Sequence, residues 1–251
     1  MRVDFCIPIK NEARTLAENL NRLAAYLEGG AQNYQWRIIG VINNSTDDSL
    51  AVCQQYEKIL PLRIVCFTAS GPGKGRAIKE GWRASNADIL AFMDADLAVG
   101  LEAIPDLIDP IIKQEADLVI GSRFLPGAKA ERSRRRAWVS KGYILLSRFF
   151  IGHKLTDIQC GFKAIRRKNF LKIERFLRDD FWFLDTELAV IAAISGAKIK
   201  EVPVNWQENR TNKNKSSIRL WQDSCHFIIN LWRLRLRLSG IKNYYKDFSN
   251  D

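Results

Sequence analysis

Short apolar strands that alternate with helical segments constrain the fold of this chain more than any other feature. Apolar runs occupy residues 3–9, 36–42, 62–67, 89–93 and 116–122. Between the first two, Leu16, Leu20, Leu23 and Leu27 fall on one helix face. This order predicts a doubly wound, parallel α/β sheet with ligands at the carboxyl ends of its strands. With 251 residues, 47% of them hydrophobic, the chain can bury a sizeable core as one domain.

Two carboxylates, Asp94 and Asp96, follow directly after the apolar run 89–93. Like charges this close repel each other unless a cation or hydrogen-bond donors compensate them. Mg²⁺ and Mn²⁺ take oxygen ligands and often bind through one or two carboxylates plus substrate phosphates. A random pair of this kind is usually a loop cap, but the position at the ligand edge favours a metal site. We therefore predict that Asp94 and Asp96 hold Mg²⁺ or Mn²⁺ on a nucleotide diphosphate.

A glycine-rich turn, "SGPGKGRA" at residues 70–77, precedes a predicted helix from about residue 75 to residue 84. It is not an ATP-binding P-loop, because Thr68 stands where the first glycine should be and Gly75 where Ser or Thr should be. Lys74, near the helix start, has two open interpretations. It faces a pyrophosphate, or it is an exposed lysine in an ordinary turn.

Net charge indicates an anionic partner. The chain carries 39 Lys+Arg and 28 Asp+Glu, for a net charge of +11. The excess lies in residues 122–148, with eight basic and one acidic residue, and in residues 198–251, with eleven and five. Nucleic acid is not the expected partner, because only Trp138 is interleaved with the basic cluster at 129–138.

Cysteine and histidine usage bears on compartment and chemistry. The five cysteines are scattered, which predicts buried free thiols in a reducing compartment. With two histidines, a histidine-based triad or metal site is not expected. The first strand begins at once and no apolar run approaches the length that spans a bilayer, so the sequence predicts a cytoplasmic protein.

The tail, residues 218–251, is predicted to be an amphipathic basic helix that follows a catalytic domain of residues 1–217. Its apolar residues keep helical spacing, although "WRLRLRL" at 232–238 also alternates with period two. Arg233, Arg235 and Arg237 flank the apolar stripe. Two interpretations stay open: the helix docks on the domain, or it lies on an anionic membrane surface.

An ordered set of motifs resembles family-2 glycosyltransferases, the inverting enzymes with the Rossmann-like GT-A fold. The set comprises "IPIKNEARTL", "NNSTDDS", "GPGKGRAIKEGW", "MDADL", "GSRFLPG", "LTDIQCGFKAIRR", "FWFLDTELAVIA" and "EVPVNW", over roughly residues 3–224. The last motif and "DIQCGFK" are most similar to polyprenyl-phosphate glycosyltransferases, especially dolichyl-phosphate glucosyltransferases and mannosyltransferases. The resemblance implies transfer of a hexose from a UDP-glucose or GDP-mannose type donor to a polyprenyl phosphate. It also implies a peripheral position on a membrane face, or a membrane-protein partner.

The resemblance assigns roles to individual residues. The nucleotide sugar would be bound by Pro8, Lys10, Glu12, Asn43, Lys74, Asp94, Ala95, Asp96, Arg210 and Lys215, the last two from a mobile loop. Arg123 and Arg136 match a basic pair that gathers donor and acceptor phosphates. Relatives carry an aspartate pair where this chain has Ile42 and Asn43, which leaves the base and the sugar open.

The acceptor decides whether a general base is needed. A sugar hydroxyl must lose a proton, and Asp185 or Glu187 would then be the base, with a helix N-cap as the alternative role for Asp185. A phosphate acceptor is already ionised, so arginines that position it suffice. Asp157 is read as an acceptor-side or loop-anchoring residue. Alternatives are a soluble or glycan hydroxyl acceptor and a nucleotidyltransferase, although "PIKNEA" at 8–13 lacks the glycine-rich turn of that class.

Overall fold

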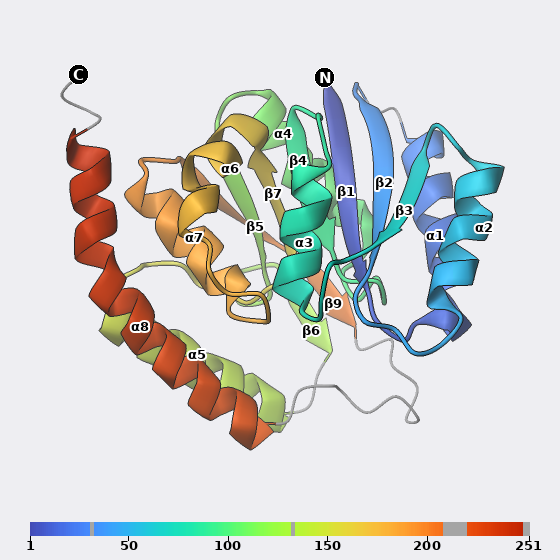
Figure 1. Ribbon diagram of the computed structural model, residues 1–251. Helices are drawn as coiled ribbons and strands as arrows, with labels where there is room; N and C mark the ends of the chain where they lie inside the picture. The colour runs from blue at the N-terminus through green and yellow to red at the C-terminus, as the bar shows by residue number, and fades with distance from the viewer. Residues whose placement is uncertain (31–32, 132–133, 208–219, 248–251) are drawn as a thin grey trace.

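The computed structural model describes residues 1–30, 33–131, 134–207 and 220–247, and of residues 134–137, 220–225 and 247 it describes the backbone alone. Its centre is a seven-stranded sheet in the order β3-β2-β1-β4-β7-β5-β8 (Figure 1). The strands are β1 (Arg2–Ile9), β2 (Gln35–Ile42), β3 (Ile64–Thr68), β4 (Ile89–Met93), β5 (Leu118–Ser122), β7 (Phe162–Arg166) and β8 (Ile199–Pro203). A two-stranded sheet pairs β6 (Lys129–Glu131) with β9 (Asn205–Gln207). The predicted α/β class is confirmed.

One strand departs from the parallel pattern. β7 lies between β4 and β5 and runs antiparallel to both, whereas the other neighbouring pairs of the large sheet are parallel. β4, β5 and most of β7 are fully buried, which fits a central position. The inserted strand brings the segment before it to the same edge as the carboxyl ends of β4 and β5.

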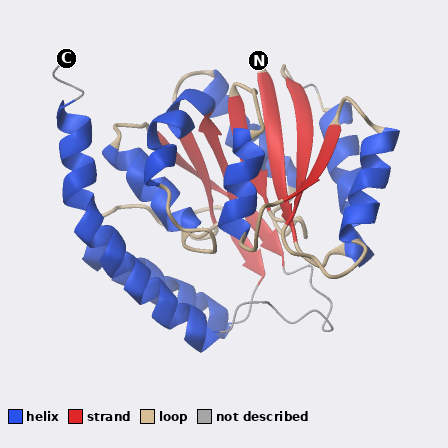
Figure 2. Ribbon diagram, in the orientation of Figure 1, coloured by secondary structure: helices blue, strands red, loops and turns tan. Residues whose placement is uncertain are grey.

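Helices cover both faces of the large sheet (Figure 2). One face carries α1 (Ala13–Gly29), α2 (Ser49–Ile59) and α4 (Ile104–Ile112), with a short 3-10 turn η1 (Leu101–Ala103). The other carries α3 (Lys74–Arg83), α5 (Arg134–Ile151), α6 (Arg167–Ile173), the 3-10 turn η2 (Glu174–Phe176), α7 (Leu184–Ile194) and α8 (Leu220–Asp247). The leucine stripe predicted for the first helix is buried on α1. Two apolar layers therefore sandwich the sheet, as a doubly wound fold requires.

The tail forms the long helix α8, so the helical spacing outweighs the period-two alternation. Leu231, Leu234, Leu238 and Ile241 are buried in the core cluster that α3, α6 and α7 share. Arg237 donates through Nη1 to Glu187 Oε1 at 2.6 Å. On the side that carries these buried residues, α8 docks on the domain, which is the first of the two interpretations of the tail. Among the described residues, no helix combines the length and the apolarity that crossing a membrane requires.

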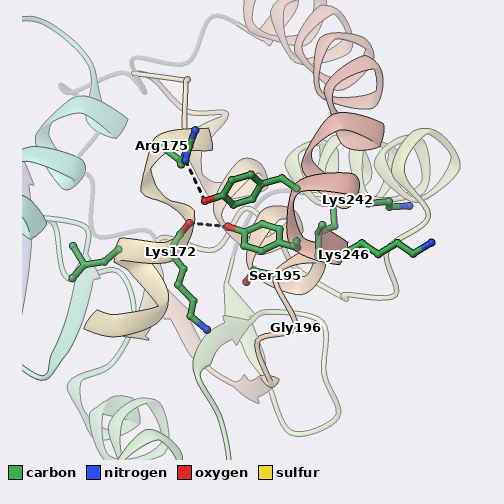
Figure 3. A pocket seen from close by; sticks show the side chains of 10 residues that line it. Lys172, Arg175, Ser195, Gly196, Lys242 and Lys246 are labelled. Carbon is green, nitrogen blue, oxygen red and sulfur yellow. Dashed lines mark hydrogen bonds between the residues drawn. The ribbon is translucent and has the colours of Figure 1, made fainter. Parts of the chain in front are cut away.

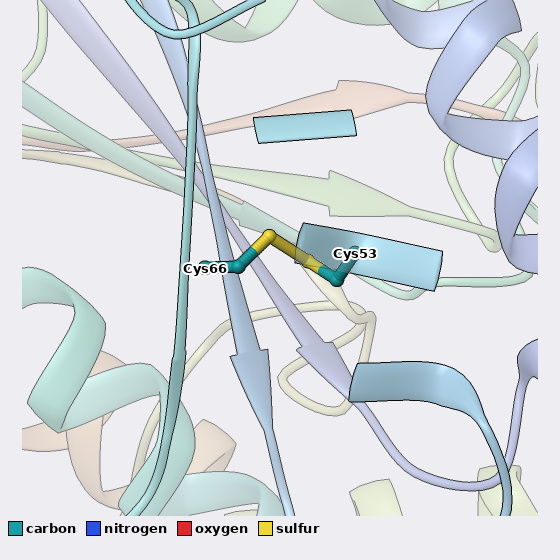
Figure 4. The surroundings of a disulfide bond; sticks show 2 residues. All are labelled: Cys53 and Cys66. Atoms are coloured by element: carbon teal, nitrogen blue, oxygen red, sulfur yellow. A yellow bond between two sulfur atoms is a disulfide. The ribbon is translucent and has the colours of Figure 1, made fainter. Parts of the chain in front are cut away.

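The expectation of free thiols throughout is wrong for one pair of cysteines. Cys53 on α2 and Cys66 on β3 form a disulfide, with their Cα atoms 6.0 Å apart (Figure 4). Cys6 and Cys160 are free and buried, as predicted. The scattered spacing gave no signal of the pair, because only the packing of α2 on the sheet brings the two side chains together.

Candidate functional site

The carboxyl ends of β1, β2 and β4 meet the N-termini of α3 and α7 at one edge of the sheet. Asn43 follows β2, and Asp94 to Asp96 follow β4. Lys74 opens α3 and Asp185 lies in the first turn of α7. These residues come from four separate stretches of chain, and the fold gathers them where ligands of such sheets bind.

Lys74 is the cation at the centre of this edge. Its Nζ lies 2.7 Å from Asp94 Oδ1 and 3.8 Å from Asp185 Oδ2, and the residue is 8% exposed. The ammonium group also lies 5.0 Å from the centre of the Trp182 ring and 5.4 Å from that of Phe92. Burial alone would lower the pKa of Lys74, but Asp94 and Asp185 outweigh it and raise that pKa. The alternative of an exposed lysine in an ordinary turn is therefore wrong.

The glycine-rich turn aims Lys74 at the carboxylates. Gly73 has a φ of +128°, and its N–H donates to Asn43 Oδ1 at 2.6 Å. A Cβ at Gly73 would lie 2.0 Å from the carbonyl oxygen of Asp180, so only glycine lets the turn approach the loop before α7. Asn43, 5% exposed, thus fixes the start of α3 with its side-chain oxygen. That hydrogen bond gives the asparagine a structural role that the sequence did not indicate.

The two carboxylates after β4 offer oxygen atoms of the kind that Mg²⁺ and Mn²⁺ bind. Gly161, just before β7, leaves the space that Asp94 Oδ2 occupies, because a Cβ there would lie 2.2 Å from that oxygen. Asp94 is 36% exposed by side chain, and Asp96 accepts from the N–H of Ala98 at 3.2 Å. In the described part of the chain, no group of three or more His, Cys, Asp or Glu residues is placed to hold a metal. A metal bound here would need further oxygen ligands, as diphosphates supply.

Asp185 is buried between two lysines. Lys163 in β7 has no exposed surface, and its Nζ donates to Asp185 Oδ1 and to the carbonyl of Cys160. The other carboxylate oxygen faces Lys74. Lys163, Asp185, Lys74 and Asp94 therefore form a row of alternating charges from the sheet interior to the edge.

The N-cap alternative for Asp185 is wrong, because Asp179 holds the start of α7. Asp179 Oδ1 accepts from the N–H groups of Phe181, Phe183 and Leu184. Asp185 makes no cap bond and lies within the helix. A carboxylate in a first helical turn is also favoured by the helix dipole.

Arg123, just after β5, is held by Asp157. Arg123 Nε and Nη2 donate to the two oxygens of Asp157 at 2.6 and 2.9 Å, and the Arg123 N–H donates at 3.1 Å. Thr156 and Asp157 are anchored in turn through their N–H groups on Glu201. Burial lowers the pKa of Arg123, but Asp157 and, more weakly, Asp94 raise it overall. The structure thus gives Asp157 a loop-anchoring contact and fixes a permanent cation near Asp94.

The turn after β1 lies beside the turn after β2. The N–H groups of Asn11 and Glu12 donate to Ser45 Oγ and Ser49 Oγ at 3.1 and 2.9 Å. Lys10 is exposed, while Pro8 and Glu12 are partly buried. These contacts place the predicted nucleoside-binding residues at the sheet edge, next to Asn43.

A family model connects this geometry with known proteins. The model for glycosyl transferase family 2 matches residues 4–173. The chain belongs to this family. Family 2 members are glycosyltransferases, so the chain is an enzyme of that kind.

Relatives and solved structures agree with the family. Glycosyltransferase AglD of Haloferax volcanii is 30% identical over 214 residues, which cover 85% of this chain and 34% of AglD. Dolichyl-phosphate beta-glucosyltransferase ALG5C of Trichomonas vaginalis is 31% identical over 247 residues, 92% of this chain and 73% of the relative. The chain thus spans about a third of AglD and about three quarters of ALG5C. Glucosyl-3-phosphoglycerate synthase of Mycobacterium tuberculosis, solved with Mn²⁺ and UDP-glucose, has a TM-score of 0.64 at 18% identity, over 93% of this chain and 79% of that one. This likeness shows the GT-A fold.

Sequence reasoning missed one buried member of this family-2 site. Lys163 was not singled out, although a lysine within the apolar run "GFKAI" is a readable signal of a buried charge with a partner. Three predicted site residues fall outside the part of the chain that the structure describes. They are Arg136, of which only the backbone is described, and Arg210 and Lys215.

A pocket of about 900 Å³ lies away from the glycosyltransferase site, between α6, α7 and α8 (Figure 3). It is lined by Lys172, Arg175, Lys242 and Lys246, and Arg175 donates to the hydroxyl of Tyr244. Lys172, Arg175 and Lys246 stand in the last turns of α6, η2 and α8. Cations in a last helical turn compensate the negative end of the helix, which applies to Lys172 on α6 and Lys246 on α8.

Proposed function

We propose that this family-2 enzyme is a metal-dependent, inverting glycosyltransferase that transfers a hexose from a nucleotide-diphospho-sugar to a polyprenyl phosphate. The relative ALG5C is named a dolichyl-phosphate beta-glucosyltransferase, which supports this acceptor class. The observation that carries the proposal is the placement of Asp185 between Lys163 and Lys74.

Both carboxylates that could act as a general base already have partners within the chain. Each oxygen of Asp185 lies beside an ammonium group. Glu187 accepts from the N–H groups of Arg178 and Asp179 and pairs with Arg237 on α8. A phosphate monoester is largely ionised at neutral pH, since its second pKa is about 6, so its oxygen can attack the anomeric carbon without a base. This site is therefore better suited to a phosphate than to a hydroxyl acceptor.

The donor diphosphate is proposed to lie against Asp94, Asp96 and Lys74. Asp94 and Asp96 would hold the cation, Mg²⁺ or Mn²⁺, which when bound would neutralise charge on the departing nucleoside diphosphate. The Nζ of Lys74 lies between two carboxylates, in contact with Asp94 and 3.8 Å from Asp185. We infer that it turns to the diphosphate when the donor binds.

Basic side chains are proposed to orient the acceptor phosphate. Arg123 is held rigidly by Asp157 at the same edge. Arg136, Arg210 and Lys215 remain predicted phosphate contacts. A bidentate guanidinium both attracts and orients a phosphate, which is what the reaction needs when no proton has to be removed.

The test measures nucleoside diphosphate release from UDP-glucose and from GDP-mannose, with Mn²⁺ or Mg²⁺. The acceptors are a polyprenyl phosphate, the matching polyprenol and a soluble sugar. We expect release that depends on the polyprenyl phosphate and on the metal. Arg136→Ala should raise the acceptor concentration needed by ~10-fold or more, because a charge-assisted hydrogen bond is lost. Release driven by the polyprenol or the sugar, and not by the phosphate, would assign the alternative hydroxyl-acceptor function.

A further inference from the structure

Trp182, in the loop between η2 and α7, is a partly exposed aromatic side chain beside the row of alternating charges. The centre of its ring lies 5.0 Å from Lys74 Nζ, and that ammonium group lies 2.7 Å from Asp94 Oδ1. Trp182 therefore stands one side chain away from the carboxylate that is proposed to hold the metal.

Packing within the domain does not account for Trp182. Among the residues that the structure describes, it belongs to neither core cluster and is not one of the apolar side chains that pack against them. In the same described part of the chain, no residue accepts a hydrogen bond from its indole N–H, whereas Trp82 donates to the carbonyl of Ala91 at 3.1 Å. A tryptophan that is used for packing buries its ring and pairs its N–H. Trp182 does neither, so its ring and its N–H are both suited to a ligand.

The loop that carries Trp182 is fastened to the glycine-rich turn. The N–H of Gly75 donates to the carbonyl of Phe181 at 3.1 Å, and the N–H of Arg76 donates to the carbonyl of Asp180 at 2.9 Å. The side chains of Arg76 and Asp180 also form an ion pair. A Cβ at Gly75 would lie 2.7 Å from the Phe181 carbonyl oxygen, so the close approach requires glycine.

Helices α7 and α8 hold the beginning of the same loop. Glu187 Oε2 accepts from the N–H groups of Arg178 and Asp179 at 2.7 and 2.8 Å. Asn230 on α8 donates to Asp179 Oδ2 at 3.3 Å. The backbone on both sides of Trp182 is thus fixed by the protein itself. A side chain held in this way contacts a ligand with little loss of conformational entropy.

The strand order places Trp182 on the sugar side of the proposed diphosphate position. The predicted nucleoside contacts follow β1 and β2, and Asp94 follows β4. The start of α7 lies beside β7, because Asp185 pairs with Lys163. In the sheet order β2-β1-β4-β7, a nucleotide-diphospho-sugar that extends from β1 across Asp94 reaches the start of α7 with its hexose.

An indole ring with an unpaired N–H matches the surface of a hexose. A hexose presents C–H groups on the faces of its ring and hydroxyl groups around the rim. The indole face packs against C–H groups, and its N–H donates to a hydroxyl oxygen. The face of the ring also attracts positive charge, as the neighbouring ammonium group of Lys74 illustrates. Positive charge develops on the sugar in the transition state of glycosyl transfer.

We propose that Trp182 binds the hexose of the donor. This inference rests on the proposed function for the class of donor, a nucleotide-diphospho-sugar, and not for the acceptor. It makes Trp182 a substrate contact, separate from Asp94 and Asp96, which are proposed to hold the metal.

The experiment is calorimetry on the full chain with Mn²⁺ and without acceptor, and it compares UDP with UDP-glucose and GDP with GDP-mannose. Trp182→Ala should weaken binding of the nucleotide sugar ~10-fold or more and change that of the free nucleotide by less than ~2-fold, because only the hexose contacts the ring. Trp182→Phe keeps a ring without an N–H, so the loss should be smaller, ~3-fold. Phe181→Ala is the matched control, since Phe181 precedes Trp182 in the same loop and is 54% exposed, and both affinities should stay as in the unchanged chain.

Three outcomes would overturn the assignment of Trp182. The first is unchanged affinity for the nucleotide sugar in Trp182→Ala. The second is an equal loss of affinity for the nucleotide and the nucleotide sugar, which would place the contact on the base or the phosphates. The third is the same loss in Phe181→Ala, which would assign the effect to the loop as a whole.

Fluorescence gives a second measurement that does not depend on the alanine variant. Tryptophan emission should change when the nucleotide sugar is added to the unchanged chain, and most of that change should be absent in Trp182→Phe. A change kept in full by Trp182→Phe would contradict the proposal.

Turnover separates this inference from the proposed function. A sugar-dependent loss of affinity in Trp182→Ala, with no turnover of the unchanged chain on any polyprenyl phosphate, would remove the proposed acceptor and leave the Trp182 contact standing. Turnover on polyprenyl phosphate with unchanged affinities in Trp182→Ala would do the reverse.

Discussion

Lys163 lies in the middle of the sheet with its ammonium group on Asp185, and Lys74 and Asp94 continue the row of charges outward. Buried ion pairs add little stability compared with apolar packing, but removing one partner leaves an uncompensated charge. At the residue scale, the site is therefore a charge row whose members depend on one another. A substitution in the row is therefore expected to lower stability even where it leaves the chemical step unchanged, so the free energy of unfolding and the turnover are measured separately.

Asp185→Asn should lower the free energy of unfolding by about 3 kcal/mol, because Lys163 loses its buried partner. Urea unfolding measures this loss. Turnover of the folded fraction should fall only mildly, since no proton has to be removed from a phosphate acceptor. Lys163→Met combined with Asp185→Leu should recover part of the stability. A rate loss of ~10²-fold or more in a variant of normal stability would instead make Asp185 a general base.

Asp94→Asn and Asp96→Asn should each lower transfer by ~10²-fold or more, because both carboxylates are proposed to hold the metal. Asp94→Asn should also lower stability, because the buried Lys74 loses its nearest carboxylate, whereas Asp96→Asn should leave the fold intact. Calorimetry should show that UDP or GDP binding no longer strengthens when Mn²⁺ is added. Asp106→Asn, an exposed carboxylate on α4, is the matched control. Unchanged transfer in either site variant, with donor in excess, is incompatible with a metal on this pair.

At the element scale, the connections between helices and strands decide which side chains reach the edge. β7 runs against its neighbours and delivers Gly161 and Lys163 to the site. The segment that leads into it, after α5, contains His153, whose Nε2 lies 2.8 Å from Ser147 Oγ on α5. The disulfide joins α2 to β3 at the opposite end of the sheet. Two predictions belong to these connections.

His153 should make stability depend on pH. Burial, with a smaller effect of Arg148, lowers its pKa from 6.5 to about 4. Between these two values the unfolded chain binds more protons than the folded one, so the free energy of unfolding should rise as pH rises from about 4 to 6.5. Above that window the contribution is constant. His153→Gln should flatten this part of a pH series of thermal unfolding midpoints, and an unchanged slope would contradict the assignment.

Loss of the Cys53–Cys66 disulfide should lower the free energy of unfolding by about 3 kcal/mol, as expected for a closed loop of this size. Urea unfolding of the Cys53→Ser and Cys66→Ser chain measures it. Cys6→Ser, a free buried cysteine, is the control for simple loss of a thiol from the core. If addition of a reductant lowers the stability of the double variant too, the effect does not come from this bond.

At the scale of the whole molecule, α8 belongs to the domain that carries the site. Its inner residues complete the core cluster that also contains α3, α6 and α7. Arg237 links the helix to Glu187 on α7, two residues from Asp185. The predicted division at residue 217 therefore separates two stretches of sequence that share one core among the described residues.

Leu234→Ala should cost about 2–5 kcal/mol of unfolding free energy, because it opens a cavity in this core. Trp232→Ala, two residues earlier on the outer side, should change it by less than about 0.5 kcal/mol. Urea unfolding of the full chain measures both. A chain ending at residue 217 should expose the cluster and bind a hydrophobic dye. Equal stability losses in the two variants would show that α8 does not pack as described.

The sequence by itself determined the alternation of strands and helices up to residue 122, the α/β class and the position of Asp94 and Asp96 after a buried strand. These features follow from local sequence patterns. The apolar runs at residues 3–9 and 89–93, for example, are each recognisable within a few consecutive positions. The motif order also indicated the family that the comparison establishes.

Only the tertiary structure decided the direction of β7, the pairing of Cys53 with Cys66, the contacts of Asp185 and the inward side of α8. Each depends on contacts between segments far apart in the chain. Lys163 and Asp185 are 22 residues apart, and Lys74 opens α3 whereas Asp94 follows β4. Local propensity does not encode such contacts, because burial and electrostatic pairing are settled only when the layers pack. The same holds for α8. Its sequence has apolar residues on two sides of the helix, and only packing shows that Leu231, Leu234 and Leu238 are buried while Trp232 and Leu236 are exposed.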